Sequence, residues 1–140
     1  MSEPIEICNL ADHNTKLELM KVAIETLSKN PDMGIVVALL ICTFMQSLAD
    51  TSNSLFYKYF ERHFPELDKS IGFMMFYKHL RNKAVHEFAI KPPLGLAHSQ
   101  FFDNENDYKK EEEIDGQKWT FLNVYRLTKD FLEHLDSLKN

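Results

Sequence analysis

The stretch FMMFYKHLRNKAVHEF, residues 73–88, carries the clearest helical pattern of the chain. At about 100° per residue, its aromatic and aliphatic side chains gather within about one third of the helix circumference. This core stripe consists of Phe73, Phe76, Tyr77, Leu80, Ala84 and Phe88. A mixed face lies opposite and consists of Met75, His79, Asn82 and His86. We therefore predict one helix, roughly residues 66–88, with one face in the core and a second face available for another role.

Helical patterns also flank this stretch on both sides. The chain has only four glycines and five prolines, so few residues interrupt its helices. We expect helices from Asn14 or Thr15 to about Asn30, from Asp32 to about Ala49, from Leu55 to Phe64, and from about Trp119 to the C-terminus. Between them, Asp115-Gly116 could close a β-hairpin. The prediction is one all-α domain over residues 1–140, an up-and-down bundle of four to five helices with a possible short hairpin near residues 110–121.

The run Met33–Met45 is almost continuously apolar and stops at Gln46. A helix needs about 18 or more apolar residues to cross a bilayer, so the run predicts a central core helix and no membrane span. The N-terminal residues 1–14 carry acidic side chains and no basic region, which argues against a secretory signal.

The two cysteines, Cys8 and Cys42, lie far apart and show no metal-ligand spacing. Cys42 lies inside the apolar run, which predicts a reduced core residue and a cytoplasmic location. The six histidines form no HExxH pattern, and the chain has no glycine-rich phosphate loop. We therefore expect neither a metal nor a cofactor.

Arg81, Asn82 and His86 are the residues on which a chemical role can be built. Arginine is a permanent cation whose fork of donors suits a phosphate group. Histidine takes and gives protons near neutral pH. Cleavage of RNA by its own 2′-hydroxyl needs phosphate binding and proton transfer, and it needs no metal.

The spacing of Arg81 and His86 resembles the Arg-x4-6-His motif of the HEPN superfamily. These small all-helical domains occur in many metal-independent endoribonucleases of defence and toxin–antitoxin systems. The residue after the arginine is usually polar in that family, and here it is Asn82. The resemblance implies an endoribonuclease with Arg81, Asn82 and His86 as catalytic residues, whose products carry 2′,3′-cyclic phosphate and 5′-hydroxyl ends.

The resemblance also implies a homodimer, because HEPN ribonucleases typically combine two motifs in one cleft. Here the Met75–Asn82–His86 face would form the interface, and an antitoxin or defence-system protein could be a further partner. In an ideal α-helix, Arg81 and His86 diverge by about 140°. Convergence therefore requires a distorted helix or a second copy of the chain. Two alternatives stay open: a non-catalytic HEPN-like domain for RNA or nucleotide binding or protein assembly, and an unrelated helical interaction protein.

Two further residues could support the site. Asp50, at the end of the second predicted helix, could orient Arg81 through a bidentate pair, or could instead cap the turn at residues 51–53. His79 shares the mixed face with His86, and both histidines could simply belong to a solvated surface.

The net charge of −5 is unusual for a protein that binds nucleic acid. Seven carboxylates lie between residues 103 and 115, against Lys109 and Lys110, so the remaining chain is neutral overall. This acidic segment could screen an RNA site, or it could be a solvated loop.

Overall fold

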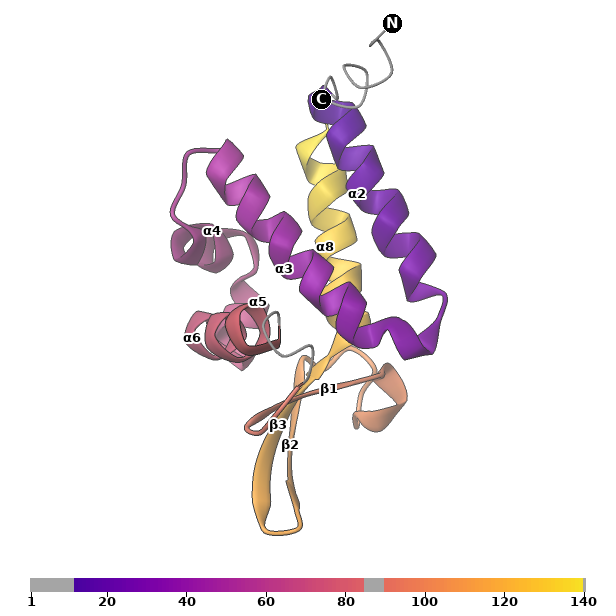
Figure 1. The fold of residues 1–140 in the computed structure, drawn as a ribbon, viewed down its shortest axis with the longest axis vertical. Coiled ribbons are helices and arrows are strands. Elements are labelled where there is room, and N and C mark those ends of the chain that lie inside the picture. The colour runs from indigo at the N-terminus through magenta and orange to yellow at the C-terminus, as the bar shows by residue number, and fades with distance from the viewer. Residues whose placement is uncertain (1–11, 85–89, 140) are drawn as a thin grey trace, which may run out of the picture.

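Six α-helices and a three-stranded sheet make up residues 12–84 and 90–139, the parts of the chain that the computed structural model describes (Figure 1). The helices are α2 (His13–Ser28), α3 (Gly34–Thr51), α4 (Phe56–His63), α5 (Pro65–Ser70), α6 (Phe73–Met75) and α8 (Val124–Leu138). The strands are β1 (Leu94–Ala97), β2 (Lys109–Ile114) and β3 (Gln117–Asn123). Two short 3-10 turns, η1 (Pro31–Met33) and η3 (Ser99–Phe101), and one π-helix, η2 (Phe76–Ala84), complete these elements.

The prediction of an all-α bundle is wrong, because the fold is mainly helical but α+β. The hairpin itself lies where the turn signal places it. Asp115 and Gly116 both have positive φ, 52° and 79°, as a tight two-residue hairpin turn requires. However, β1 pairs with β3 in parallel, which gives a mixed sheet in the order β1-β3-β2. β1 has only four residues and pairs with a distant segment, so no local pattern reveals it.

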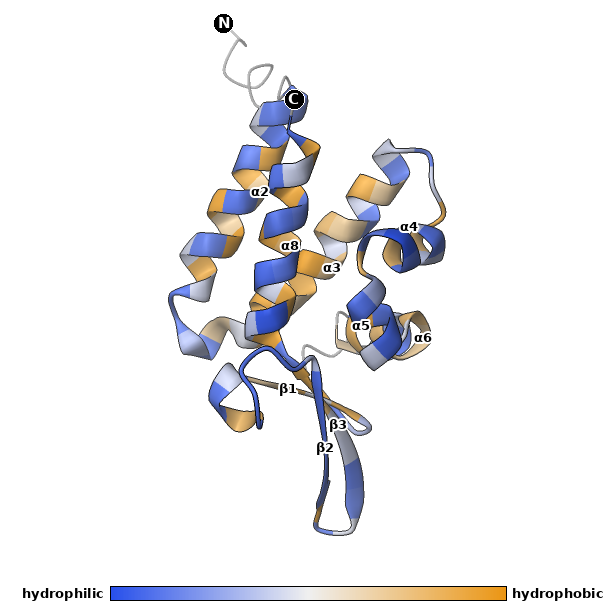
Figure 2. Cartoon of the chain, turned by 180° about the vertical axis from the view of Figure 1, so that it is seen from behind, coloured by the Kyte–Doolittle hydropathy of each residue, from blue (hydrophilic) through white to orange (hydrophobic). Residues whose placement is uncertain are grey.

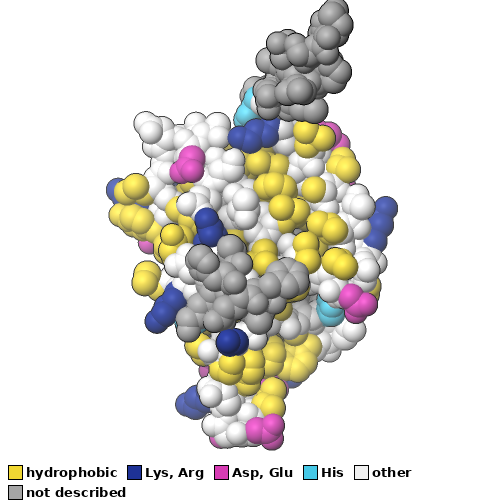
Figure 3. All heavy atoms as spheres, in the orientation of Figure 1, with side chains coloured by type: hydrophobic (Ala, Val, Ile, Leu, Met, Phe, Trp, Pro, Cys, Tyr) yellow, Lys and Arg dark blue, Asp and Glu magenta, His cyan; other side chains and the backbone are white. Residues whose placement is uncertain are grey.

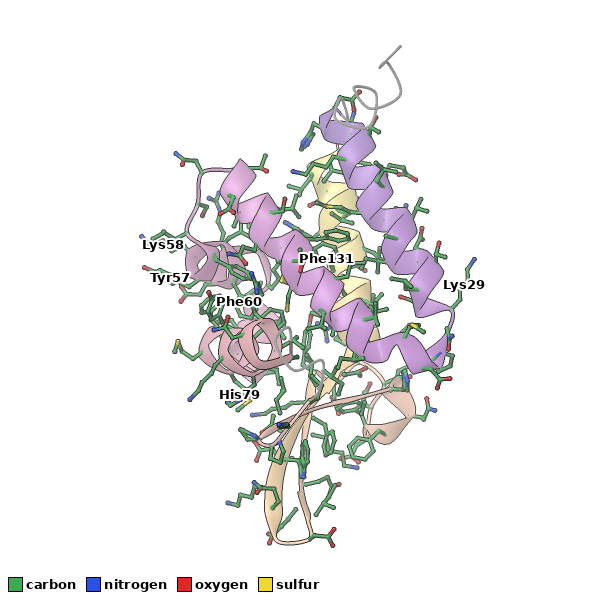
Figure 4. The ribbon with its side chains drawn as sticks, viewed as in Figure 1. Lys29, Tyr57, Lys58, Phe60, His79 and Phe131 are labelled. Carbon is green, nitrogen blue, oxygen red and sulfur yellow. The ribbon has the colours of Figure 1, made fainter. Side chains whose placement is uncertain are left out.

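Three helices, α2, α3 and α8, build the main core (Figure 1). Each buries one apolar face, and Figure 2 shows the alternation of hydrophobic and hydrophilic residues along these helices. Side chains with no exposed area include Leu17 and Ile24 of α2, Ile41 and Met45 of α3, and Leu127 and Phe131 of α8. Figure 4 shows Phe131 between these helices. The first, second and last predicted helices are therefore confirmed in position, although α8 begins at Val124 and Trp119 belongs to β3.

The helix through α3 is longer than the apolar run alone suggests. Residues 31–51 form a helical segment of 21 residues, and its most apolar window has a mean hydropathy of 1.8, so the segment is long and apolar enough to cross a membrane by length and composition. Only 39% of its most apolar window is buried. The length of the apolar run therefore does not by itself exclude a membrane span. The inward face of α3 nevertheless packs in the core, as predicted, and Cys42 there is a free, buried thiol.

The single helix predicted over residues 66–88 is wrong, because the chain breaks at Gly72. Its φ of 86° lies in the left-handed region that favours glycine, and α5 ends just before it. After the break, α6 leads into the π-helix η2. Aromatic contacts hold this segment on α4: the ring centroids of Phe56 and Phe73 are 5.2 Å apart, and those of Phe60 and Phe76 are 5.0 Å apart.

The core stripe predicted for this segment is mostly confirmed. Phe76, Leu80 and Ala84 have no exposed area, whereas Phe73 and Tyr77 are half-buried. Phe88 lies outside the described residues. The stripe survives the change of helix type because its buried members are four residues apart, a spacing close to one turn of either helix.

Candidate functional site

Arg81 projects from η2 onto α3, where its position is set by a polar partner. Its Nε donates a hydrogen bond of 2.9 Å to Oε1 of Gln46, and the arginine is half-buried. This contact uses one of the five N–H donors of the guanidinium, and the Nη groups carry the other four. A half-buried guanidinium held at one edge is suited to bind an anion with its remaining edge.

Cys42 lies one helical turn before Gln46 on α3, and the positive charge of Arg81 also acts on its thiol. Burial raises the pKa of the Cys42 thiol well above its ordinary value, and the charge of Arg81 opposes this shift only in part. Cys42 is therefore a neutral, inert neighbour of the arginine.

Asp50 lies one helical turn beyond Gln46 and is exposed. Its backbone carbonyl accepts hydrogen bonds from Ser52 and Asn53, so its described contacts belong to the turn that ends α3. The described hydrogen-bond partner of Arg81 is Gln46, which the sequence analysis did not select. The spacing of Gln46 and Asp50, four residues apart on one helix face, is a signal that could have suggested both.

The remaining predicted residues are only partly placed. Asn82 is half-buried beside Arg81 on η2, and His79 is half-buried with its Nδ1 atom fully covered. Figure 4 shows His79 on the side of η2 nearest the sheet, whereas Tyr57 and Lys58 project outward from α4. His86 lies outside the described residues.

The π-helical form of residues 76–84 changes the geometry of the motif segment. In a π-helix, hydrogen bonds join residues that are five positions apart. Such segments are rare in proteins overall, but those that occur are frequently at functional sites. Positions i and i+5 therefore lie closer together around the axis than in an α-helix. The described part of this segment is thus distorted from an α-helix, and it ends at Ala84, before His86.

Exposed lysines accompany this segment, among them Lys58, Lys78 and Lys91. Figure 3 shows Lys and Arg side chains around the region where α3, α6 and the sheet meet. Arg62, which is close to the motif in sequence, instead lines a different depression and does not add to this group.

This depression, of about 430 Å³, lies between α4 and α8. It contains a pair of histidines, His63 and His134, that the sequence analysis missed. The rings of His63 and His134 have centroids 4.8 Å apart, and Nε2 of His134 is 2.5 Å from the Tyr59 hydroxyl. Burial, and secondarily His63, lowers the pKa of His134 to about 4. Burial raises the pKa of Tyr59 to about 12, so near neutral pH neither Tyr59 nor His134 is charged. Tyr59 and His63, four residues apart on α4, are a visible helix pair, but nothing local connects them with His134.

Glu66, Asp130 and Glu133 also line this depression. Among the described residues, no group of three or more histidines, cysteines and carboxylates is arranged to hold a metal ion.

The acidic segment is divided between an exposed loop, residues 103–107, and strand β2. Glu111–Glu113 lie in β2, and the loop before it is tied to the start of α8. There, Asn123 Nδ2 donates to the backbone carbonyls of Glu105 and Asp107, at 2.9 and 2.8 Å. These hydrogen bonds hold the loop with Glu105 and Asp107 beside the start of α8, whereas Glu111–Glu113 lie on the hairpin.

Comparison of the chain with models of known protein families, with curated proteins and with solved structures found no match.

Proposed function

We propose that the protein is a metal-independent endoribonuclease that uses Arg81, Asn82 and His86. The observation that carries the proposal is the π-helix that presents Arg81, with its guanidinium held at one edge by Gln46. Arg81 and His86 are five positions apart, the spacing that π-helical geometry favours on one side of a helix. The HEPN-like motif supplies the chemistry for these residues, and defence or toxin–antitoxin systems are the setting that the resemblance suggests.

In the proposed reaction, His86 removes the proton of the 2′-hydroxyl or delivers a proton to the leaving 5′-oxygen. The 2′-oxygen attacks the adjacent phosphorus while the bond from phosphorus to the 5′-oxygen breaks. Arg81 binds the scissile phosphate and stabilises the negative charge that develops on its oxygens. Asn82 orients the phosphate through its amide. The products carry 2′,3′-cyclic phosphate and 5′-hydroxyl ends.

One observation favours the alternative of a non-catalytic helical domain that binds RNA or nucleotides or supports assembly. Arg81 is already engaged by Gln46, so the arginine could serve only to join η2 to α3. The two functions differ in whether RNA is cut, which a single experiment decides.

The purified protein is expected to cleave single-stranded RNA at neutral pH in the presence of EDTA. The test is to separate the fragments and treat them with polynucleotide kinase, with and without its 3′-phosphatase activity, to identify their ends. Cleavage that requires Mg²⁺, or fragments with 5′-phosphate ends, would contradict the proposal. Binding without cleavage would support the non-catalytic alternative.

We also propose that the protein forms a homodimer through the η2 side of the molecule, as the resemblance implies. The predicted interface residue Met75 is half-buried and packs against the core of its own chain, so it is a poor probe. Met74, one residue earlier, is 73% exposed. Met74→Glu is expected to shift sedimentation from dimer to monomer, whereas Leu19→Glu, at a side chain of α2 that is 60% exposed, leaves the dimer intact. A wild-type protein that is monomeric at micromolar concentration would exclude this interface.

A further inference from the structure

The sheet has an aromatic face directed away from the helical core. Trp119 and Phe121 are two residues apart on β3 and therefore project from the same face. Their rings are nearly parallel, with centroids 5.6 Å apart and an angle of 14°. Phe101 of η3 extends the row, at 4.8 Å from Phe121. The opposite face carries Leu94 and Leu122, which belong to the core.

Gly95 allows these rings to lie close against β1. A Cβ atom at Gly95 would come within 2.5 Å of the Phe121 ring and 3.1 Å of the Trp119 ring. The missing side chain therefore seats both rings on the strand backbone. None of the three aromatic side chains is fully buried, and Phe101 is 37% exposed. The row, here called the aromatic face, consists of Phe101, Trp119 and Phe121.

Charged side chains on β2 stand directly beside this face. In the strand register, Lys110 is opposite Phe121 and Glu112 is opposite Trp119. The Lys110 ammonium lies 5.0 Å from the centre of the Phe101 ring and forms ion pairs of 3.4 Å with Asp103 and Glu112. One end of the aromatic face therefore already binds a cation of its own chain, between an aromatic ring and two carboxylates.

The other end, at Trp119, offers the same combination of an aromatic ring and neighbouring carboxylates. Glu111–Glu113, Lys118 and Trp119 line a depression of about 330 Å³ on the hairpin. Figure 1 shows that the hairpin extends away from the helices, and Figure 2 shows β2 as hydrophilic along most of its length. Indole is the best aromatic partner for a cation, and a neighbouring carboxylate adds charge attraction.

We propose that the aromatic face docks a cationic segment of a partner protein, with an arginine or lysine side chain over Trp119 and beside Glu112. Charge complementarity selects this occupant, since carboxylates outnumber lysines seven to two over residues 103–115. The same charges repel a nucleic-acid backbone. Arginine fits best, because its planar guanidinium can stack on indole while it binds a carboxylate. This inference does not depend on the proposed ribonuclease activity.

Trp119 is the only tryptophan of the chain, so its fluorescence reports on this face directly. The probe is a synthetic peptide of alternating arginine and glycine, and its control is the same peptide with citrulline, an uncharged isostere, in place of arginine. We expect a saturable change in Trp119 fluorescence with the arginine peptide and none with the citrulline peptide. Equal responses to both peptides would overturn the proposal.

A pair of variants separates docking on this face from general charge attraction. Glu112→Gln, on the aromatic face, is expected to weaken binding of the arginine peptide about two- to fivefold. Glu111→Gln removes the same charge from the opposite face of the same strand and should weaken it less. Equal effects of the two variants would show attraction by net charge alone and overturn the proposal. So would tighter binding of oligouridylate than of the arginine peptide, which would assign the face to RNA.

Discussion

Replacing His86 by alanine is expected to lower the rate of RNA cleavage by about 10²–10⁴-fold, the usual effect of losing a general acid or base. Arg81→Ala should cost about 10²–10³-fold, as for other groups that stabilise charge developing in a transition state. Single-turnover cleavage of a fluorescent oligoribonucleotide measures both effects. Circular dichroism and a urea unfolding curve establish that each variant is folded. A folded His86→Ala protein with wild-type activity would refute the proposed mechanism.

Gln46 should behave as a positioning residue for Arg81 in the same assay. Loss of a group that orients a functional side chain typically costs about 10–100-fold, and Gln46→Ala is expected to fall in this range. Gln46→Glu keeps an acceptor oxygen for Nε of Arg81 and should restore most of the activity. Asp50→Ala is the matched control, because Asp50 lies one turn further on α3 and its described contacts are in the turn beyond. Comparable losses in Gln46→Ala and Asp50→Ala would contradict this role of the Gln46 contact.

The second large effect is a loss of stability in acid that originates in the histidine pair. The pKa of His134 is lowered from 6.5 to about 4 by burial and then by His63, so the unfolded state binds the proton more tightly than the folded state. His63 shifts in the same direction, through burial and the Arg62 cation. Stability is therefore retained above pH 6.5 and is lost as the pH falls toward 4. The expected loss from His134 is on the order of 2–3 kcal/mol in the free energy of unfolding.

Urea unfolding at pH 7 and pH 4.5 measures this loss. Carboxylates elsewhere in the protein also take up protons as the pH falls, so the informative quantity is the difference between proteins. His134→Gln keeps a polar partner for the Tyr59 hydroxyl but does not titrate, and its stability should depend less on pH than that of the wild type. His98→Gln, near the other end of α8, should retain the wild-type dependence. If His134→Gln and wild type lose the same free energy, the histidine pair does not cause the effect.

Several parts of the fold are readable from the chain because short-range interactions determine them. The apolar spacing of α2, α3 and α8 predicts helices, since side chains three and four residues apart share a face. The turn at Asp115-Gly116 is readable because few residues tolerate two successive positive φ angles. The buried stripe of Phe76, Leu80 and Ala84 follows from the same local periodicity.

The start of the motif helix and the start of α8 were predicted wrongly for identifiable reasons. Gly72 has few neighbours that signal a break, and a glycine within a helical pattern is often tolerated. Trp119 and Leu122 fit a helical spacing with the residues of α8, but pairing with β1 and β2 places them in β3. Packing against distant strands overrides a weak local preference.

The sequence by itself determined which residues could perform the proposed chemistry and which segments would be mainly helical. Tertiary structure alone decided that Gln46, rather than Asp50, holds Arg81, that His63 meets His134, and that β1 completes a mixed sheet. The physical reason is the range of the interactions. Helix periodicity and turn chemistry depend on neighbours in the chain, whereas these contacts join residues that only the packing of the whole domain brings together.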